Sequence, residues 1–104
     1  MYNYYYIKTK SISETLVTSA IENYLRSFSI FEEENGNFTS QKPFLDISIL
    51  NVKNPDSWNS LDYNKYITNY ISIITSVFSE DDNYIKDILK GLENLTGLKI
   101  YPDD

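Results

Sequence analysis

Apolar and polar residues alternate along two stretches of the chain in the pattern of half-buried strands. Residues 2–9 (YNYYYIKT) are mostly aromatic or β-branched, and Tyr5 and Ile7 fall on one side of the expected strand. Residues 43–52 (PFLDISILNV) alternate in the same way, with aliphatic side chains on one face and polar ones on the other. The pattern therefore predicts two strands, the second of which starts just after Pro43.

Two other segments repeat their apolar residues at helical spacing. Within residues 11–28, the apolar positions recur at i, i+1, i+4 and i+5, which predicts an amphipathic helix with one buried stripe. Ser11 and Glu14 have the spacing of a capping box at the start of this helix. A second stripe runs through residues 84–95 and predicts a second helix of the same kind.

Three shorter segments complete the expected order of elements. Residues 66–78 fit both a helix and a strand by periodicity, but their density of β-branched residues favours a strand. Asn35 and Gly36 stand between two phenylalanines and predict a type I′ turn, which would close an additional hairpin after the first helix. Residues 98–101 (LKIY) can form a short last strand.

The chain is therefore expected to form a single α+β domain over residues 1–104, a length that suits one hydrophobic core. Its elements follow the order β-α-β-β-α-β, with the extra hairpin inserted after the first helix. Because both helices have one apolar stripe to bury, we expect them on one face of an antiparallel sheet, as in a ferredoxin-like sandwich.

The composition removes most catalytic chemistry. The chain has no cysteine and no histidine, which excludes disulfides, thiolate nucleophiles, and the commonest general base and metal ligand. The consecutive acids Glu32, Glu33 and Glu34 cannot all converge on one site, and the acidic run in residues 79–83 stands where it would cap a helix. We therefore predict a protein that is not an enzyme, with no catalytic, metal-binding or cofactor-binding residues.

Charge and hydropathy narrow the choice of partners. The net charge is −6 at pH 7, so the surface should repel the phosphates of nucleic acids and attract a basic protein. The N-terminal residues lack the pattern of a signal peptide, and no apolar run approaches the length of a membrane span. The expectation is a cytoplasmic protein that binds another protein, and neither nucleic acid nor a membrane.

Trp58 is the single tryptophan, and it lies in a polar stretch without a hydrophobic repeat. Trp58 and Tyr63 are flanked by Asp56 and Asp62. Tryptophan and tyrosine are typical interface anchors because they bury a large area and lose little rotamer entropy. The alternative is that Trp58 folds back over the sheet edge and closes the core, and both hold if only one ring face is covered.

A second aromatic group is expected on the open face of the sheet. If the helices cover Tyr5 and Ile7, then Tyr2, Tyr4 and Tyr6 line the uncovered side of the first strand. Platforms that stack single-stranded nucleic acid look similar, but they carry lysines and arginines, which are few near this strand. These tyrosines either pack along a half-exposed sheet or bind a partner, and a protein suits the negative charge better than RNA.

The chain resembles the small acidic immunity proteins that bacteria encode beside secreted toxins. The shared features are size, negative charge, missing catalytic residues, an aromatic and acidic loop, and the expected sheet with two helices. The resemblance implies a stoichiometric inhibitor that covers a basic toxin domain, often a nuclease, and mimics the charge of its substrate. The candidate partner-binding residues are Trp58, Asp56, Asp62, Tyr63, Glu32, Glu33, Glu34, Tyr4 and Tyr6.

Two other functions fit the same sequence features. A phage-encoded inhibitor of a host defence enzyme would have the same size, charge and lack of catalytic residues. A ferredoxin-like homo-oligomer with a regulatory or small-ligand role belongs to a different class and stays open as well. An enzyme that depends on carboxylates alone ranks last.

Overall fold

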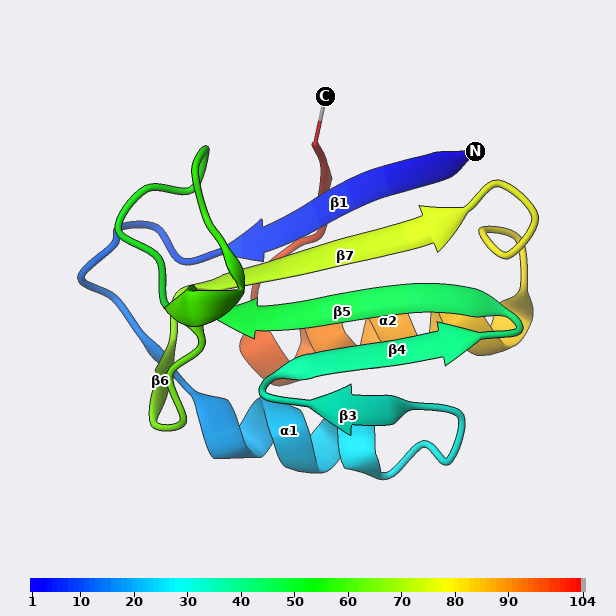
Figure 1. Cartoon of the computed structure of the whole chain (residues 1–104), viewed down its shortest axis with the longest axis horizontal. Helices are drawn as coiled ribbons and strands as arrows, with labels where there is room; N and C mark the ends of the chain where they lie inside the picture. Colours follow the sequence, from blue (N-terminus) through cyan, green and yellow to red (C-terminus); the bar gives the residue numbers. More distant parts are fainter. Residues whose placement is uncertain (104) are drawn as a thin grey trace.

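The structure, a computed structural model that describes residues 1–103, is built on a six-stranded antiparallel sheet with both helices on one face (Figure 1). The helices are α1 (Thr18–Arg26) and α2 (Asn83–Thr96), and neither helix of the described residues is long and apolar enough to cross a membrane. Two short strands, β2 (Leu16–Val17) and β6 (Ile67–Thr68), pair as a separate ribbon. The main sheet has the order β3 (Glu32–Glu34), β4 (Asn37–Gln41), β5 (Phe44–Leu50), β7 (Tyr70–Ser76), β1 (Tyr2–Lys8) and β8 (Tyr101–Pro102).

The main hydrophobic core lies between the sheet and the helices. Alternation along β5 directs Leu45, Ile47 and Ile49 towards the helices, and all three side chains are fully buried. Ile47 pairs with Ile73 of β7, so the aliphatic rows of neighbouring strands lie side by side. Burying an aliphatic side chain stabilises the fold by roughly 1.5–3 kcal/mol. The helices close this core with their own apolar stripes, which are Ile21 and Leu25 from α1 and Ile85, Ile88 and Leu92 from α2.

Two predictions about local structure are confirmed. Residues 66–78 contain the strands β6 and β7, which agrees with their content of β-branched residues. The hairpin between β3 and β4 also forms, because Asn35 (φ 46°) and Gly36 (φ 80°) occupy the two left-handed positions of its turn.

The predicted β-α-β-β-α-β order is not matched, although the α+β class and the placement of two helices on one sheet face are confirmed. Eight strands form within residues 1–103, and the β3–β4 hairpin extends the main sheet beyond β5. Phe38 of β4 explains this difference, since its side chain is fully buried opposite Ile47 of β5. Burial of this large ring in the main core favours pairing of the hairpin with β5 over a hairpin that stands apart from the sheet.

The first helix begins later than its apolar stripe predicts. Ser11 and Glu14 form a turn through a backbone hydrogen bond of 3.1 Å instead of a capping box, and β2 occupies the next residues. The helix starts at Thr18, whose hydroxyl bonds to the Thr68 hydroxyl at 2.7 Å and donates to the Asn64 carbonyl at 2.9 Å. These long-range hydrogen bonds, together with the β2–β6 pairing, outweigh the local helical preference.

A second, smaller hydrophobic cluster lies on the opposite face of the sheet, which the helices leave open (Figure 1). Leu50, Val52 and Tyr70 are buried there, and Tyr6 and Trp58 pack against them. The loop after β5 therefore folds over one end of the open face and brings the single tryptophan onto the strands.

Candidate partner-binding surface

A row of tyrosines crosses the open face of the sheet. Tyr2 and Tyr4 of β1 are 52% and 51% exposed. Tyr6, the next residue on this side of β1, lies 5.9 Å from Tyr70 and 6.0 Å from Tyr101 between ring centroids. The rings of Tyr6 and Tyr70 are nearly parallel, with an angle of 8° between their planes. β1 thus presents its tyrosines on the uncovered side, in agreement with its alternation.

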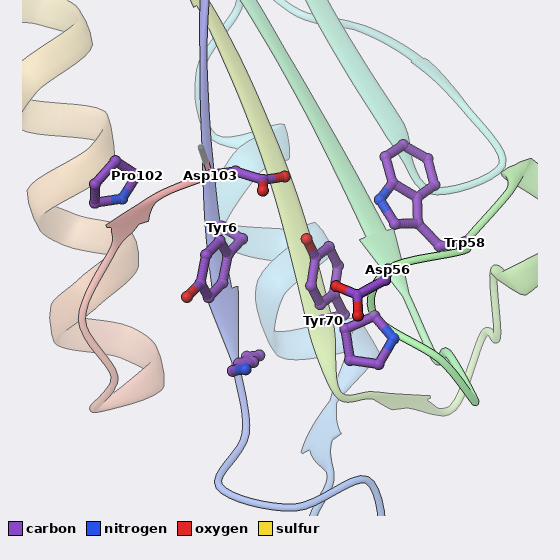
Figure 2. Close-up of a pocket in the computed structure, with 8 residues that line it drawn as sticks. Tyr6, Asp56, Trp58, Tyr70, Pro102 and Asp103 are labelled. Carbon is purple, nitrogen blue, oxygen red and sulfur yellow. The ribbon is translucent and has the colours of Figure 1, made fainter.

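A cavity of about 400 Å³ adjoins this row beside Trp58 (Figure 2). The Trp58 and Tyr70 rings are tilted by 41° at a centroid distance of 6.5 Å, so the two aromatic faces form an angled wall. The Lys8 ammonium lies 5.5 Å from the centroid of the Tyr6 ring. The cavity is lined by Tyr6, Lys8, Pro55, Asp56, Trp58, Tyr70, Pro102 and Asp103.

Two asparagines hold the loop that carries Asp56 and Trp58. The Asn54 side chain accepts a hydrogen bond of 3.0 Å from the Asp56 amide, which closes an Asx turn. The buried Asn69 side chain accepts from the Val52 amide at 2.8 Å and donates to the Val52 carbonyl at 2.9 Å. The loop is therefore fixed by hydrogen bonds around Pro55. These bonds, and not the packing of the indole alone, hold Trp58 in its position.

The electrostatic environment of the cavity is negative. The pKa of Tyr70 is raised to about 12, mainly by burial and in part by the nearby Asp103, Tyr6 and Asp56 side chains, while Trp58 acts in the opposite direction. Tyr70 therefore keeps its proton at neutral pH and offers an uncharged phenol to the cavity.

A second hollow of about 410 Å³ lies on the other side of the Trp58 side chain. Its wall includes Glu34 at the end of β3, Leu50 of β5 and the 88% exposed Leu61. Trp58 lines both hollows, so the indole stands between them as a ridge on the open face. The Trp58 side chain covers a hydrophobic cluster and remains partly exposed, so it can still contact a partner.

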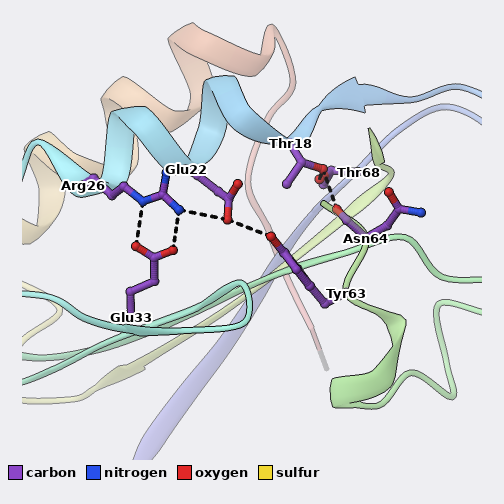
Figure 3. Close-up of polar contacts among 7 residues, drawn as sticks. All are labelled: Thr18, Glu22, Arg26, Glu33, Tyr63, Asn64 and Thr68. Carbon is purple, nitrogen blue, oxygen red and sulfur yellow. Dashed lines mark hydrogen bonds and ion pairs between the residues drawn. The ribbon is translucent and has the colours of Figure 1, made fainter. Parts of the chain in front are cut away.

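Tyr63 and Glu33 belong to a different part of the molecule (Figure 3). The Tyr63 hydroxyl donates to Glu22 of α1 at 2.9 Å, and the Tyr63 ring lies against Gly36, where a Cβ atom would come within 2.2 Å of it. Arg26 donates to the two carboxylate oxygens of Glu33 at 2.7 and 2.6 Å, which lowers the pKa of Glu33. These residues connect α1 to the β3–β4 turn and have a structural role in the free protein.

Asp62 is also committed to local structure. It ends η1 (Ser60–Asp62), where its carboxylate accepts from the Asn59 amide at 2.9 Å and so forms half of a capping box. Glu32 remains exposed on β3 and pairs with Thr39 of β4 on the open face.

The structure thus divides the predicted residues into separate groups. Tyr6, Asp56 and Trp58 line one cavity, with Tyr4 beside Tyr6 on the same face of β1. Glu32 and Glu34 lie on the open face at the β3 edge of the sheet. Their partners on β4, Thr39 and Asn37, alternate with Phe38, which faces the core. Glu33, Asp62 and Tyr63 line neither hollow beside Trp58, and their side chains form hydrogen bonds within the chain.

Sequence reasoning missed three residues of the open face. Tyr70 could have been found from alternation, because Ile71 and Ile73 face the core and their neighbours must face the other way. Tyr101 and Asp103 had no such signal. Their position depends on β8 pairing with β1, where the Asp103 amide donates to the Tyr4 carbonyl at 2.8 Å.

Among residues 1–103, no group of three or more acidic side chains is placed to hold a metal ion. No protein-family model matches the chain, and a search of curated proteins found no similar sequence.

Proposed function

We propose that the protein is a non-catalytic binding protein, and that it acts as an immunity protein that neutralises a cognate bacterial toxin by covering it with the open face of the sheet. The observation that carries this proposal is the exposed aromatic row on that face, flanked by carboxylates. Tyr2, Tyr4 and Tyr101 are each about half exposed, and Trp58 stands between two hollows.

The aromatic side chains suit a binding face for energetic reasons. These exposed tyrosines are grouped on one face and do not belong to the buried core. Exposed apolar groups of this kind are typical of interaction sites. Tyrosine and tryptophan bury large areas with few rotatable bonds, and their polar atoms can still form hydrogen bonds at an interface. A partner placed over the row would bury the open face of the sheet, as the helices bury the opposite face.

The charge of the face favours a basic partner over a second copy of this chain. Carboxylates are spread over the open face from β3 to the segment after β8, in Glu32, Glu34, Asp46, Asp56 and Asp103. Two copies placed face to face would bring these like charges together, which is unfavourable at a desolvated interface. A basic toxin domain would gain both attraction at a distance and complementarity at contact.

The test uses the reading frame next to the gene for this chain. We expect its product to stop bacterial growth when expressed alone, and co-expression of this protein to restore growth through a one-to-one complex. Tyr4→Ser combined with Trp58→Ala should lose most of this protection. Tyr66→Ser is the control. Tyr66 directly precedes β6, is 68% exposed and lies outside the aromatic row. A neighbouring product that is not toxic, or a toxin that this protein does not neutralise, would contradict the proposal.

A further inference from the structure

We propose that the cavity beside Trp58 receives one arginine side chain of the basic partner, an inference that rests on the proposed function. The cavity combines three aromatic side chains, Tyr6, Trp58 and Tyr70, with two carboxylates, Asp56 and Asp103 (Figure 2). Its volume of about 400 Å³ exceeds what a single guanidinium group needs, so the cavity has room for the side chain.

The aromatic walls favour a delocalised cation. A cation within about 6 Å of a ring centroid is attracted by the electrons of the ring face, and guanidinium groups also stack on aromatic planes. Tyr70 offers its ring in an uncharged form at neutral pH, since its pKa is raised to about 12. Trp58, the strongest cation–π acceptor among side chains, forms the wall nearest to the second hollow.

The carboxylates come from two segments far apart in the sequence. Asp56 belongs to the loop after β5, whereas Asp103 follows β8, and both side chains lie near Tyr70 (Figure 2). Lys8 is the cation in the lining, so two negative charges face one positive charge. This balance repels anions and leaves one carboxylate without a compensating charge for an incoming cation.

Lys8 places a cation against one aromatic wall of the cavity. Its ammonium group lies 5.5 Å from the Tyr6 ring centroid, within the range of a cation–π contact. The lysine side chain is exposed, so it can move aside at little cost when another cation arrives. An arginine is favoured over a lysine in this role, because its guanidinium is more weakly hydrated and can bond to a carboxylate while it stacks on a ring.

The experiment uses the isolated protein and three small probes, N-acetylarginine amide, N-acetylcitrulline amide and N-acetyllysine amide. Trp58 is the single tryptophan, so its fluorescence and its indole NMR signal report on the cavity. We expect the arginine probe to bind saturably in the millimolar range, as suits so small a ligand. The neutral citrulline probe, which has nearly the same shape, should bind about tenfold more weakly, and the lysine probe should fall between the two.

Charge variants separate a local site from the general negative field. Asp56→Asn combined with Asp103→Asn should weaken arginine binding by roughly three- to tenfold. The matched control is Asp81→Asn combined with Asp87→Asn, which removes the same amount of charge from two exposed positions. Asp81 precedes α2 and Asp87 lies within it, and this variant should leave arginine binding nearly unchanged. Equal losses in both double variants, or equal binding of the arginine and citrulline probes, would overturn the inference.

The toxin assay separates this inference from the proposed function. If the unaltered protein does not neutralise the neighbouring product, the function fails, whatever the probes show. If it neutralises the toxin and the Asp56→Asn, Asp103→Asn variant does so with unchanged affinity, only the arginine site is overturned. We expect the double variant to bind the toxin at least about threefold more weakly, with unaltered folding.

Discussion

The two faces of the sheet bury apolar surface with different side chains. On the face covered by helices, aliphatic residues such as Ile47 and Ile73 are fully buried. On the open face, β1 holds tyrosines, of which Tyr2 and Tyr4 remain about half exposed, while β5 and β7 hold mostly polar residues such as Ser48 and Ser72. The strands are shared, so the difference arises from alternation alone.

This contrast assigns different work to the two faces. Isoleucine and leucine contribute to stability through close packing, and they have no polar atom to satisfy. Tyrosine contributes area to a contact while its hydroxyl remains in water until a partner covers it. Substitutions on the helix-covered face should therefore change stability, whereas substitutions on the open face should change mainly binding.

Leu25→Asp should have the largest effect. The Leu25 side chain of α1 is fully buried in the main core, and an unpaired carboxylate there costs several kcal/mol against a total stability of about 5–15 kcal/mol. Circular dichroism should show an unfolded or strongly destabilised protein. Ala20→Asp, on the exposed side of the same helix, is the control and should melt close to the unaltered protein. A soluble Leu25→Asp variant with an unchanged melting transition would remove α1 from the core.

Adjacent residues of β7 compare the two faces directly. Ile73 is fully buried and pairs with Tyr5, whereas Ile74 is partly exposed on the open face and pairs with Tyr4. Ile73→Thr should cost about 2–4 kcal/mol, because it leaves a small cavity and buries a hydroxyl, and Ile74→Thr should cost less than about 1 kcal/mol. Denaturant unfolding measures both, and threonine keeps the β preference in each. Similar losses would mean that the open face also acts as a core.

The sequence predicts the parts of the fold that depend on local pattern. Alternation correctly located β1 and β5, and the Asn35–Gly36 pair located a hairpin turn, because each signal lies within a few consecutive residues. The start of α1 could not be predicted in this way. It depends on the hydrogen bonds of Thr18 with Thr68 and Asn64, which are distant in sequence.

The candidate surface follows the same division. Tyr4 and Tyr6 were identified because one strand places them on one face. Asp62 and Tyr63 resemble Asp56 and Trp58 in sequence, yet hydrogen bonds to Asn59 and Glu22 turn them to local roles. Composition cannot reveal which acid or aromatic residue of a loop already has an intramolecular partner.

Trp58→Ala tests the boundary between the two faces. Trp58 packs on the smaller cluster and remains partly exposed, so truncation should cost about 1–2 kcal/mol of stability, less than the 3–5 kcal/mol typical of a fully buried tryptophan. Partner binding should weaken by about 2 kcal/mol or more, as at an interface hot spot. Thermal melts and titration calorimetry measure the two effects. A large loss of stability with unchanged binding would make Trp58 a core residue and move the binding site to the tyrosines of β1.

Alkaline titration compares one tyrosine from each face and should give the smallest effect. A hydrogen bond to Glu80 of 2.6 Å raises the pKa of Tyr5 to about 12 on the helix-covered face, whereas burial raises the pKa of Tyr70 to about 12 on the open face. Since both values lie above the ordinary 10, the associated stability is fully present below pH 10 and is lost as the pH rises to about 12. Tyr5→Phe and Tyr70→Phe should each reduce this alkaline loss by about 1 kcal/mol in denaturant unfolding.

At neutral pH the two variants should differ, because the causes of the raised pKa differ. Tyr5→Phe removes a donor from Glu80 and should cost about 1 kcal/mol. Tyr70→Phe keeps the ring in its apolar surroundings and should cost less, since burial is the main cause of its raised pKa. Tyr66→Phe, at a 68% exposed position, is the control for both and should follow the unaltered protein throughout. An alkaline loss that neither Tyr5→Phe nor Tyr70→Phe reduces would show that these hydroxyls do not contribute to the pH dependence of either face.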